Sequence, residues 1–299
     1  MNETISSSTI LEELSNGLAR QGISKTEKVR CTRELEIILG RLKSREYRQS
    51  NFLPRNVLTI TERTDEMFKE LRFLWSVGAV WKELLQEIGI HRVKSALDIG
   101  CGFFPKAELG FYYLNFTGKL TLLDCSAEAL RQAAHFLKFF NVGFSVERVP
   151  VSLWDLPDHR YDLIVANHSL DDLILDAAAR ECGVSLIDAY RSEALFQELW
   201  QSIIKDSSLG AEVMDRLAEF IAGHLNPGGR VVLLDYPSRS HRALGLNSIP
   251  RYVGARQKDL RACLEGKGFK QQPLLKGGSI CRERLVVSAN HVVCAVAPR

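Results

Sequence analysis

The stretch ALDIGCGFFP (Ala96–Pro105) has the pattern of an apolar strand that leads into a turn with two glycines. Glycine lets the backbone turn tightly and come close to a ligand. A second apolar run, LTLLDCS (Leu120–Ser126), contains Asp124 at its polar end. An acid about 20 residues after such a turn can accept both hydroxyls of a ribose. The two runs therefore predict a strand–turn–helix–strand unit that binds a nucleoside.

The residues around the glycines distinguish between two kinds of nucleotide site. A dinucleotide site uses a third glycine for close packing of its helix, but Phe103–Pro105 follows Gly102 here. Asp98 lies two residues before Gly100, where a carboxylate would repel a pyrophosphate and can hold an amino group. This arrangement favours a cationic ligand over a dinucleotide.

These residues resemble motif I of the class I S-adenosylmethionine (SAM) methyltransferases, in which an acid is followed by Gly-x-Gly. The resemblance extends over residues 93–297 and implies SAM as the cofactor. It implies that Asp124 binds the ribose, that Asp98 faces the amino group of the methionine portion, and that Gly100 and Gly102 make room for both. The cofactor-binding residues expected on this basis are Asp98, Gly100, Cys101, Gly102, Asp124, Cys125, Ser152, Leu153 and Asn167.

The bulk composition fits a globular protein. The 299 residues are 45% hydrophobic and 25% charged, and the net charge of +3 is too small to indicate nucleic acid by itself. The seven cysteines never form a Cys-x-x-Cys pair, so we expect no metal site and no disulfide framework. We find neither the apolar core of a signal peptide nor a run long enough to span a membrane. We therefore expect a cytoplasmic protein with no membrane partner.

The periodicity of apolar residues divides the chain in two. Residues 1–90 show helical spacing, for example at Cys31–Leu42 and Met67–Ile88, and are interpreted as a helical cap or lid. Residues 91–299 alternate short strands with helices, which is typical of a parallel sheet covered on both faces. The expected strands are Ser95–Ile99, Lys119–Leu123, Ser145–Val149, Asp162–Ala166, Arg230–Asp235, Lys270–Leu275 and Arg284–Ala295. The expected helices are Lys106–Leu114, Ala127–Phe140, Leu195–Leu225 and Gln257–Lys267.

The last two strands are expected to pair antiparallel, which resembles the reversed seventh strand of class I methyltransferases. The turn Pro227–Gly229 lies where that family places a breaker before its fifth strand. The predicted fold class is therefore α/β, with a seven-stranded, mostly parallel sheet, helices on both faces, an antiparallel last strand and an N-terminal helical cap.

A second block, YDLIVANHSLDD (Tyr161–Asp172), is an apolar strand that ends in polar residues. Open α/β sheets bind ligands at that edge. The block is similar to the Asn-His-x-Leu-x-His motif of small-molecule methyltransferases, except that Asp172 stands at the position of the second histidine. The catalytic candidates are His168, Asp171, Asp172 and, after the next strand, Tyr236.

These candidates have more than one interpretation. His168 has a pKa near neutrality and can act as a general base. The preferred interpretation is that Asn167 and His168 shape the methionine end of the cofactor site and cap the next helix. Asp171 and Asp172 can receive an amine, although one of them can instead be a helix N-cap. Tyr236 is the aromatic candidate for the floor of the pocket.

The segment VSLWDLP (Val151–Pro157) lies where the family keeps an acid that binds adenine. Asp155 is the acid present, but Ser152 and Leu153 match the usual position better. Leu153 or Trp154 can form an apolar wall for adenine, and Trp154 fits a plain core position equally well.

Two long segments have no counterpart in a minimal core. One is a helical insert at about residues 173–210, which contains Tyr190, Phe196 and Trp200. The other is Tyr236–Tyr252. Long connections at a ligand edge often have a function or form a lid. The second segment contains four basic residues that suit either a substrate anion or a solvated loop: Arg239, His241, Arg242 and Arg251.

The favoured function is methyl transfer from SAM to O or N of a small-molecule acceptor. The alternative is an RNA methyltransferase of the ribosomal, aminoglycoside-resistance type, for which a basic cluster would contact phosphates. That cluster is Arg41, Lys43, Arg45, Arg48 and Arg55. Two further readings are transfer of the aminocarboxypropyl group of SAM and a non-catalytic SAM-binding protein. The sequence leaves open the acceptor, the methylated atom and the oligomeric state.

Overall fold

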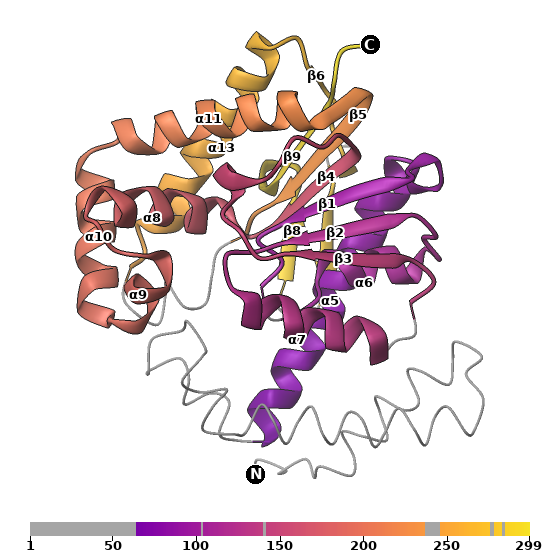
Figure 1. Ribbon diagram of the computed structural model, residues 1–299, viewed down its shortest axis with the longest axis horizontal. Coiled ribbons are helices and arrows are strands. Elements are labelled where there is room, and N and C mark those ends of the chain that lie inside the picture. Colours follow the sequence, from indigo (N-terminus) through magenta and orange to yellow (C-terminus); the bar gives the residue numbers. More distant parts are fainter. Residues whose placement is uncertain (1–63, 103, 140–141, 237–245, 276–277, 283–284) are drawn as a thin grey trace.

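The computed structural model describes residues 64–102, 104–139, 142–236, 246–275, 278–282 and 285–299 (Figure 1). Statements about the structure refer to these residues. The basic cluster around Arg45, the predicted helix Cys31–Leu42 and most of the predicted cap lie outside them.

A seven-stranded sheet forms the centre of the molecule. Its strands are β1 (Ser95–Ile99), β2 (Lys119–Leu123), β3 (Ser145–Val149), β4 (Tyr161–Asn167), β5 (Leu225–Leu234), β6 (Lys270–Gln271) and β9 (Val292–Val296). Their order is β3-β2-β1-β4-β5-β9-β6. The first five strands in this order pair parallel, and β9 pairs antiparallel with both β5 and β6. The predicted mostly parallel sheet with a reversed last strand is confirmed.

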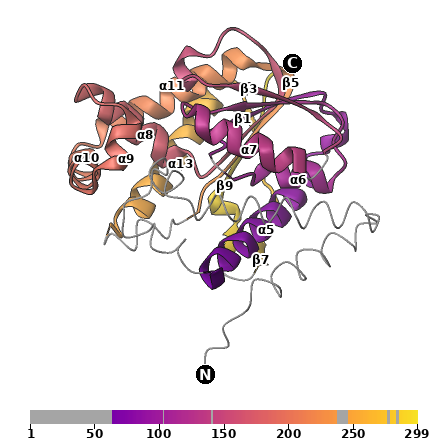
Figure 2. The same cartoon turned by 60° about the horizontal axis from the view of Figure 1, so that its bottom comes forward.

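Helices cover both faces of this sheet (Figure 2). On one side lie α5 (Thr64–Glu87), α6 (Ala107–Tyr113) and α7 (Ala127–Phe139). The other side has α8 (Leu170–Glu181), α9 (Leu186–Arg191), α10 (Glu193–Lys205), α11 (Ser208–His224) and α13 (Ile249–Gly266). Central strands that are covered on both faces need apolar residues in succession, which explains why β1 and β4 are almost continuously buried.

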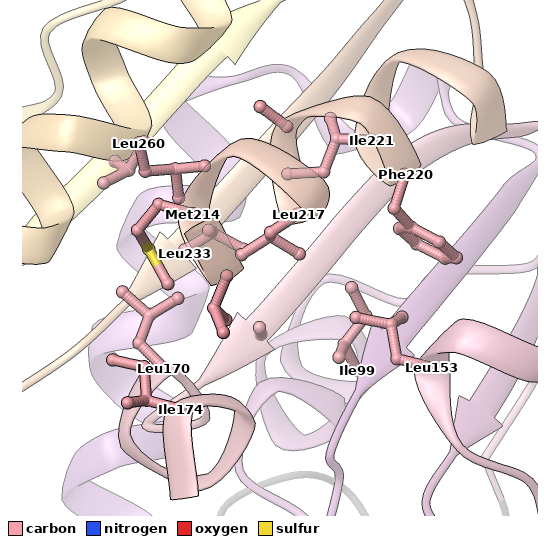
Figure 3. Packing of buried hydrophobic residues seen from close by; sticks show 14 of the residues in the cluster. Ile99, Leu153, Leu170, Ile174, Met214, Leu217, Phe220, Ile221, Leu233 and Leu260 are labelled. Carbon is pink, nitrogen blue, oxygen red and sulfur yellow. The ribbon is translucent and has the colours of Figure 1, made fainter. Parts of the chain in front are cut away.

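One of the two cores is shown in Figure 3. Met214, Leu217 and Ile221 of α11 lie over the sheet, where Leu233 and Ile99 point toward them. These α11 residues recur at helical spacing, so a single stripe of the helix meets the sheet. The core holds the carboxyl ends of β1, β4 and β5 against a fixed layer of helices.

The second half of α5 belongs to the core on the opposite face, together with α6. A Cβ atom added to Gly110 would lie 2.7 Å from the Cβ atom and 2.9 Å from the backbone carbonyl carbon of Trp81. Gly78 is similarly close to Leu109. The two helices therefore cross in near backbone contact, and the packed core begins before residue 91. The proposed cap or lid role of the segment before it stays a prediction.

The C-terminal region differs from the prediction of one long strand at Arg284–Ala295. A short turn, η5 (Ala289–His291), separates β8 (Leu285–Ser288) from β9, and β8 pairs with β7 (Ser279–Arg282) in a separate hairpin. The backbone N–H of Ser288 donates to Nδ1 of His291 at 3.1 Å, which stabilises the turn and interrupts the strand.

Three other predicted boundaries are also wrong. The helix predicted at Leu195–Leu225 is divided into α10 and α11, because Asp206 accepts a hydrogen bond from the backbone of Ser208 at 2.9 Å and starts a new helix. The strand expected at Lys270–Leu275 has only two residues, and α13 begins at Ile249 instead of Gln257. Among the described residues, no helix combines the length and the apolar character needed to cross a membrane.

We expect Gly110→Ala to lower the free energy of unfolding by about 1–3 kcal/mol, because the added methyl group would push α5 away from α6. Urea denaturation measures the change. Gly254→Ala in α13 is the matched control, since no atom of the described residues lies within 4 Å of the added Cβ atom. Its helix propensity should raise stability by about 0.5–1 kcal/mol. Equal effects of the two substitutions would contradict the close helix crossing.

Candidate functional site

The parallel pairing brings four strand ends to one edge of the sheet. Ile99 pairs with Leu123 of β2 and with Ala166 of β4. Asn167 pairs with Leu234 of β5. The polar residues that follow these strands are consequently neighbours, although they are up to about 140 positions apart in the sequence.

The glycine turn after β1 requires both of its glycines. Gly100 and Gly102 have φ angles of +65° and +67°, a region that disfavours other residues. The backbone N–H of Gly100 donates to the carbonyl of Leu123 at 2.8 Å, and the Ser169 hydroxyl donates to the carbonyl of Ile99 at 2.9 Å. A Cβ atom at Gly100 would lie 3.2 Å from the Ser169 hydroxyl oxygen, whereas one at Gly102 would meet no atom of the described residues within 4 Å. Within the described part of the chain, the backbone at Gly102 is therefore open to a ligand.

Asp124 joins this turn to the end of β2. One carboxylate oxygen accepts from the backbone N–H of Gly102 at 3.0 Å, and the other accepts from that of Ser126 at 2.8 Å. Burial raises the pKa of Asp124, and the two N–H donors oppose that rise. Each oxygen keeps a second lone pair that can accept a hydrogen bond from a ribose hydroxyl. Of the neighbouring candidates, Cys101 is buried and Cys125 is exposed.

Asp98 has a buried acidic neighbour that the sequence analysis missed. Asp98 is 1% exposed and Glu108, in the first turn of α6, is 0% exposed. Burial and the proximity of Glu108 raise the pKa of Asp98 well above its usual range, and burial raises that of Glu108 to about 7. The pair therefore tends to keep a proton. Glu108 gave no signal in the sequence, because an acid in the first turn of a helix is ordinarily a solvent-exposed residue.

The segment predicted to contact adenine lies in a short turn, η3 (Leu153–Asp155). Leu153 is buried in the core shown in Figure 3, near Ile99, and Asp155 is exposed. The guanidinium of Arg216 lies 4.4 Å from the centre of the Trp154 ring, so Trp154 packs beneath a cation from α11. Ser152 precedes the turn and is half-buried. The adenine contact of Ser152 and Leu153 stays a prediction.

Asn167 connects three separate segments at the end of β4. Its side-chain oxygen accepts from Nε1 of Trp81 at 2.8 Å, and its side-chain nitrogen donates to the Tyr236 hydroxyl at 3.2 Å. Because α5, β4 and the chain after β5 meet at this one amide, Asn167 fixes the position of Tyr236. Trp81 was not a predicted site residue, since its spacing in α5 marks it as an ordinary core position.

His168 lies between two carboxylates. Its Nδ1 is 2.8 Å from Asp235, its Nε2 is 3.6 Å from Asp171, and its ring stacks on Tyr236 with centroids 5.0 Å apart. Burial opposes the charged imidazolium, but Asp171 and Asp235 outweigh it and raise the pKa of His168 to about 10. The histidine is thus held as a cation near neutral pH. Its backbone has a φ of +57°, in the left-handed region that few residues other than glycine adopt.

Asp235 is a site residue absent from the predicted set, although an acid that follows a strand had already identified Asp124. His168, Asp171 and Asp235 each bring one potential ligand atom to within 4.8 Å of the others. Both ring nitrogens of His168 already face carboxylates, so we interpret these three residues as an ion-pair cluster.

The two adjacent acids of α8 have different surroundings. The N-cap of α8 is Ser169, and neither Asp171 nor Asp172 takes that position. Asp171 is 4% exposed, whereas Asp172 is half-buried and accepts a hydrogen bond from the hydroxyl of Tyr190. Tyr190 lies in α9 of the helical insert. The interpretation that Asn167 and His168 cap α8 is also wrong, since the N-cap position belongs to Ser169.

Most of the long segment Tyr236–Tyr252 lies outside the described residues, and so do three of its four basic residues, Arg239, His241 and Arg242. Arg251 is exposed on α13. The binding of a substrate anion by these four basic residues stays a prediction.

We expect the stability difference between the wild type and His168→Gln to depend on pH. The folded pKa is raised from 6.5 to about 10, so the contribution of the charge is complete below pH 6.5 and is lost as the pH rises toward 10. Urea denaturation should show the difference shrinking by up to about 1.4 kcal/mol per pH unit between pH 7 and 9. Asp235→Asn removes one source of the shift and should weaken this dependence. A difference that is constant from pH 7 to 9 would contradict the charged cluster.

No protein-family model matches the chain, and no curated protein matches it in sequence. Similar solved structures include the N-methyltransferase NodS from Bradyrhizobium japonicum WM9, with 14% identity, a TM-score of 0.43, and coverage of 75% of this chain and 97% of that chain. Another is the magnesium protoporphyrin IX methyltransferase ChlM from Synechocystis PCC 6803 with bound SAH, with 14% identity, a TM-score of 0.45 and coverage of 79% and 87%. A third is the ribosomal protein L11 methylase from Lactobacillus delbrueckii subsp. bulgaricus, with 13% identity, a TM-score of 0.40 and coverage of 75% and 78%.

The TM-scores of these comparisons are below 0.5, so the fold assignment depends on features of the chain itself. Its strand order, the reversed β9, the glycine turn after β1 and the acid after β2 agree with the resemblance found in the sequence. The chain has the fold of the class I SAM-dependent methyltransferases.

Proposed function

We propose that this chain is a SAM-dependent methyltransferase that acts on O or N of a small-molecule acceptor. The main support is the glycine turn that Asp124 holds at the carboxyl edge of β1 and β2. This edge is where open α/β sheets bind ligands. The open backbone at Gly102 and the remaining lone pairs of Asp124 suit a ribose.

The chain's own residues suit a cationic cofactor. SAM supplies an activated methyl group, so the protein has chiefly to position the acceptor and exclude water. The acids Asp98 and Asp124 lie on the β1–β2 side of the site and Asp171 and Asp172 on the β4 side. A positive sulfonium between them is electrostatically favourable. A pyrophosphate at the same position would be repelled.

The small-molecule acceptor is supported by the burial and the polar contacts of the side chains on the β4 side. Tyr236 is 7% exposed and is stacked against His168, and the insert brings Tyr190 to Asp172. These residues form a compact set of polar groups instead of an extended basic surface. An RNA acceptor remains the second candidate, because the basic cluster at residues 41–55 belongs to the chain. Transfer of the aminocarboxypropyl group would use the same cofactor residues and is distinguished by product mass.

The decisive experiment is calorimetric titration of the purified protein with SAM, with its demethylated product and with NADH, each alone and with bulk RNA. Micromolar binding of SAM or its product without binding of NADH is the expected result. Tight, salt-dependent association with RNA would favour the RNA methyltransferase. Failure to bind either sulfur nucleoside would exclude the proposed function.

In the same titration, Asp124→Asn is expected to weaken SAM binding about tenfold, because the amide nitrogen cannot accept the second hydroxyl and the charge is lost. Asp215→Asn is the matched control, since Asp215 lies on α11 within 3.6 Å of Lys267. It should leave the affinity unchanged. Unchanged SAM affinity in Asp124→Asn would remove Asp124 from the cofactor site.

A further inference from the structure

The acids around the site differ in their partners. Most of them are held by a cation or by backbone N–H groups among the described residues. These are Asp124 with the N–H groups of Gly102 and Ser126, Asp171 and Asp235 with His168, and Asp176 with Arg180 at 2.9 Å. Cations and N–H donors of this kind favour the charged form of a carboxyl group.

Asp172 is different, because its hydrogen-bond donor is a neutral phenol. The Tyr190 hydroxyl donates to Oδ1 of Asp172. Asp172 is half-buried, whereas Asp171 beside it is buried. Oδ2 of Asp172 is therefore the best placed carboxylate oxygen on this side to receive a proton from a bound molecule.

Tyr190 reaches Asp172 from the helical insert, and aromatic packing fixes its position. Its ring lies 5.2 Å from that of Phe196, which lies 6.5 Å from that of Trp200 in a T-shaped contact. Phe196 and Trp200 are buried in α10. Ser185 caps α9 by accepting from the backbone N–H of Asp188 at 3.1 Å. The insert thus presents the phenol on a packed pair of helices.

Building on the proposed methyl transfer, we propose that Asp172 is the base that removes the acceptor's proton and that Tyr190 is its positioning residue. The acceptor's O–H or N–H bond breaks and its proton moves to Oδ2 of Asp172. The electron pair left on the O or N atom forms the bond to the methyl carbon. The carbon–sulfur bond breaks with its electrons going to sulfur, and Asp172 later releases the proton to water.

The titratable groups that face Asp172 support this assignment. They come from its own helix (Asp171), from the end of β4 (His168), from the end of β2 (Asp124, with Cys125 beside it) and from α9 (Tyr190). Burial and the charge of Asp171 raise the pKa of Asp172 to about 7, while the Tyr190 hydrogen bond and His168 limit that rise. A general base is most effective when its pKa lies near the working pH.

His168 is a poor base by comparison. Its two ring nitrogens face Asp235 and Asp171, and it retains its proton well above neutral pH. In this arrangement the histidine serves as the shared cation of Asp171 and Asp235. The proton of the acceptor is then left to the neighbouring Asp172.

The proposal is tested by carbon NMR of the full chain labelled with 13C at the aspartate carboxyl groups. The Asp172 signal is identified by its loss in Asp172→Asn. We expect its titration midpoint near pH 7 in the wild type and roughly one pH unit higher in Tyr190→Phe, because the donor to the carboxylate is lost. An Asp172 signal that titrates below pH 5, or the same midpoint in both proteins, would overturn the proposal.

Tyr252→Phe is the matched control. Tyr252 lies next along the same aromatic series, 6.4 Å from Trp200, and its loss of a hydroxyl should leave the Asp172 midpoint unchanged. An equal shift in Tyr252→Phe would mean that loosened packing, and not the hydrogen bond, moves the pKa, which overturns the positioning role.

If Tyr190→Phe does not fold, 3-fluorotyrosine at position 190 keeps the ring and strengthens the donor. It should lower the Asp172 midpoint, and an unchanged midpoint would again overturn the proposal. None of these titrations requires SAM. Failure of SAM binding would thus reject the proposed function, while the NMR result separately decides the Asp172–Tyr190 pair.

Discussion

The parallel alignment of β1, β2, β4 and β5 is the constraint on which the site depends. Hydrogen bonding in register makes all four strands end at one edge. Each strand is buried on both faces, so polar residues appear mostly where the strand leaves the core, with the buried Asp98 of β1 and Thr121 of β2 as exceptions. Asp124, Asn167 and Asp235 occupy such positions. The concentration of polar groups at this edge is therefore a consequence of how the sheet is buried.

Placing many acids together in a partly buried region is unfavourable unless each carboxylate is stabilised. The protein meets this requirement in several ways. Asp124 is stabilised by backbone N–H groups, Asp98 and Glu108 share a high proton affinity, and His168 lies between Asp171 and Asp235 as their shared cation. Because the carboxyl groups have different surroundings, their pKa values differ. Groups of one chemical type can then have different roles.

Elements outside the minimal sheet complete the site. α5 approaches α6 closely at Gly110, and this contact places Trp81 where it donates to Asn167. On the other face, the insert brings Tyr190 to Asp172. Each addition contributes one of the polar contacts described at the site. The geometry of the site is thus coupled to the packing of both helical layers, and a substitution in either layer can displace a side chain at the edge.

The sequence by itself determined the sheet class, the reversed last strand and the glycine turn with Asp124, because these depend on local periodicity and on residues within one βαβ unit. It also located Asn167–Asp172, since a strand that ends in polar residues is visible in the chain. The protonation state of His168, the partner of Asp98 and the contact between Tyr190 and Asp172 were decided only by the tertiary structure. A pKa depends on charges and burial in space, and residues 18 or 67 positions away in the chain supply them.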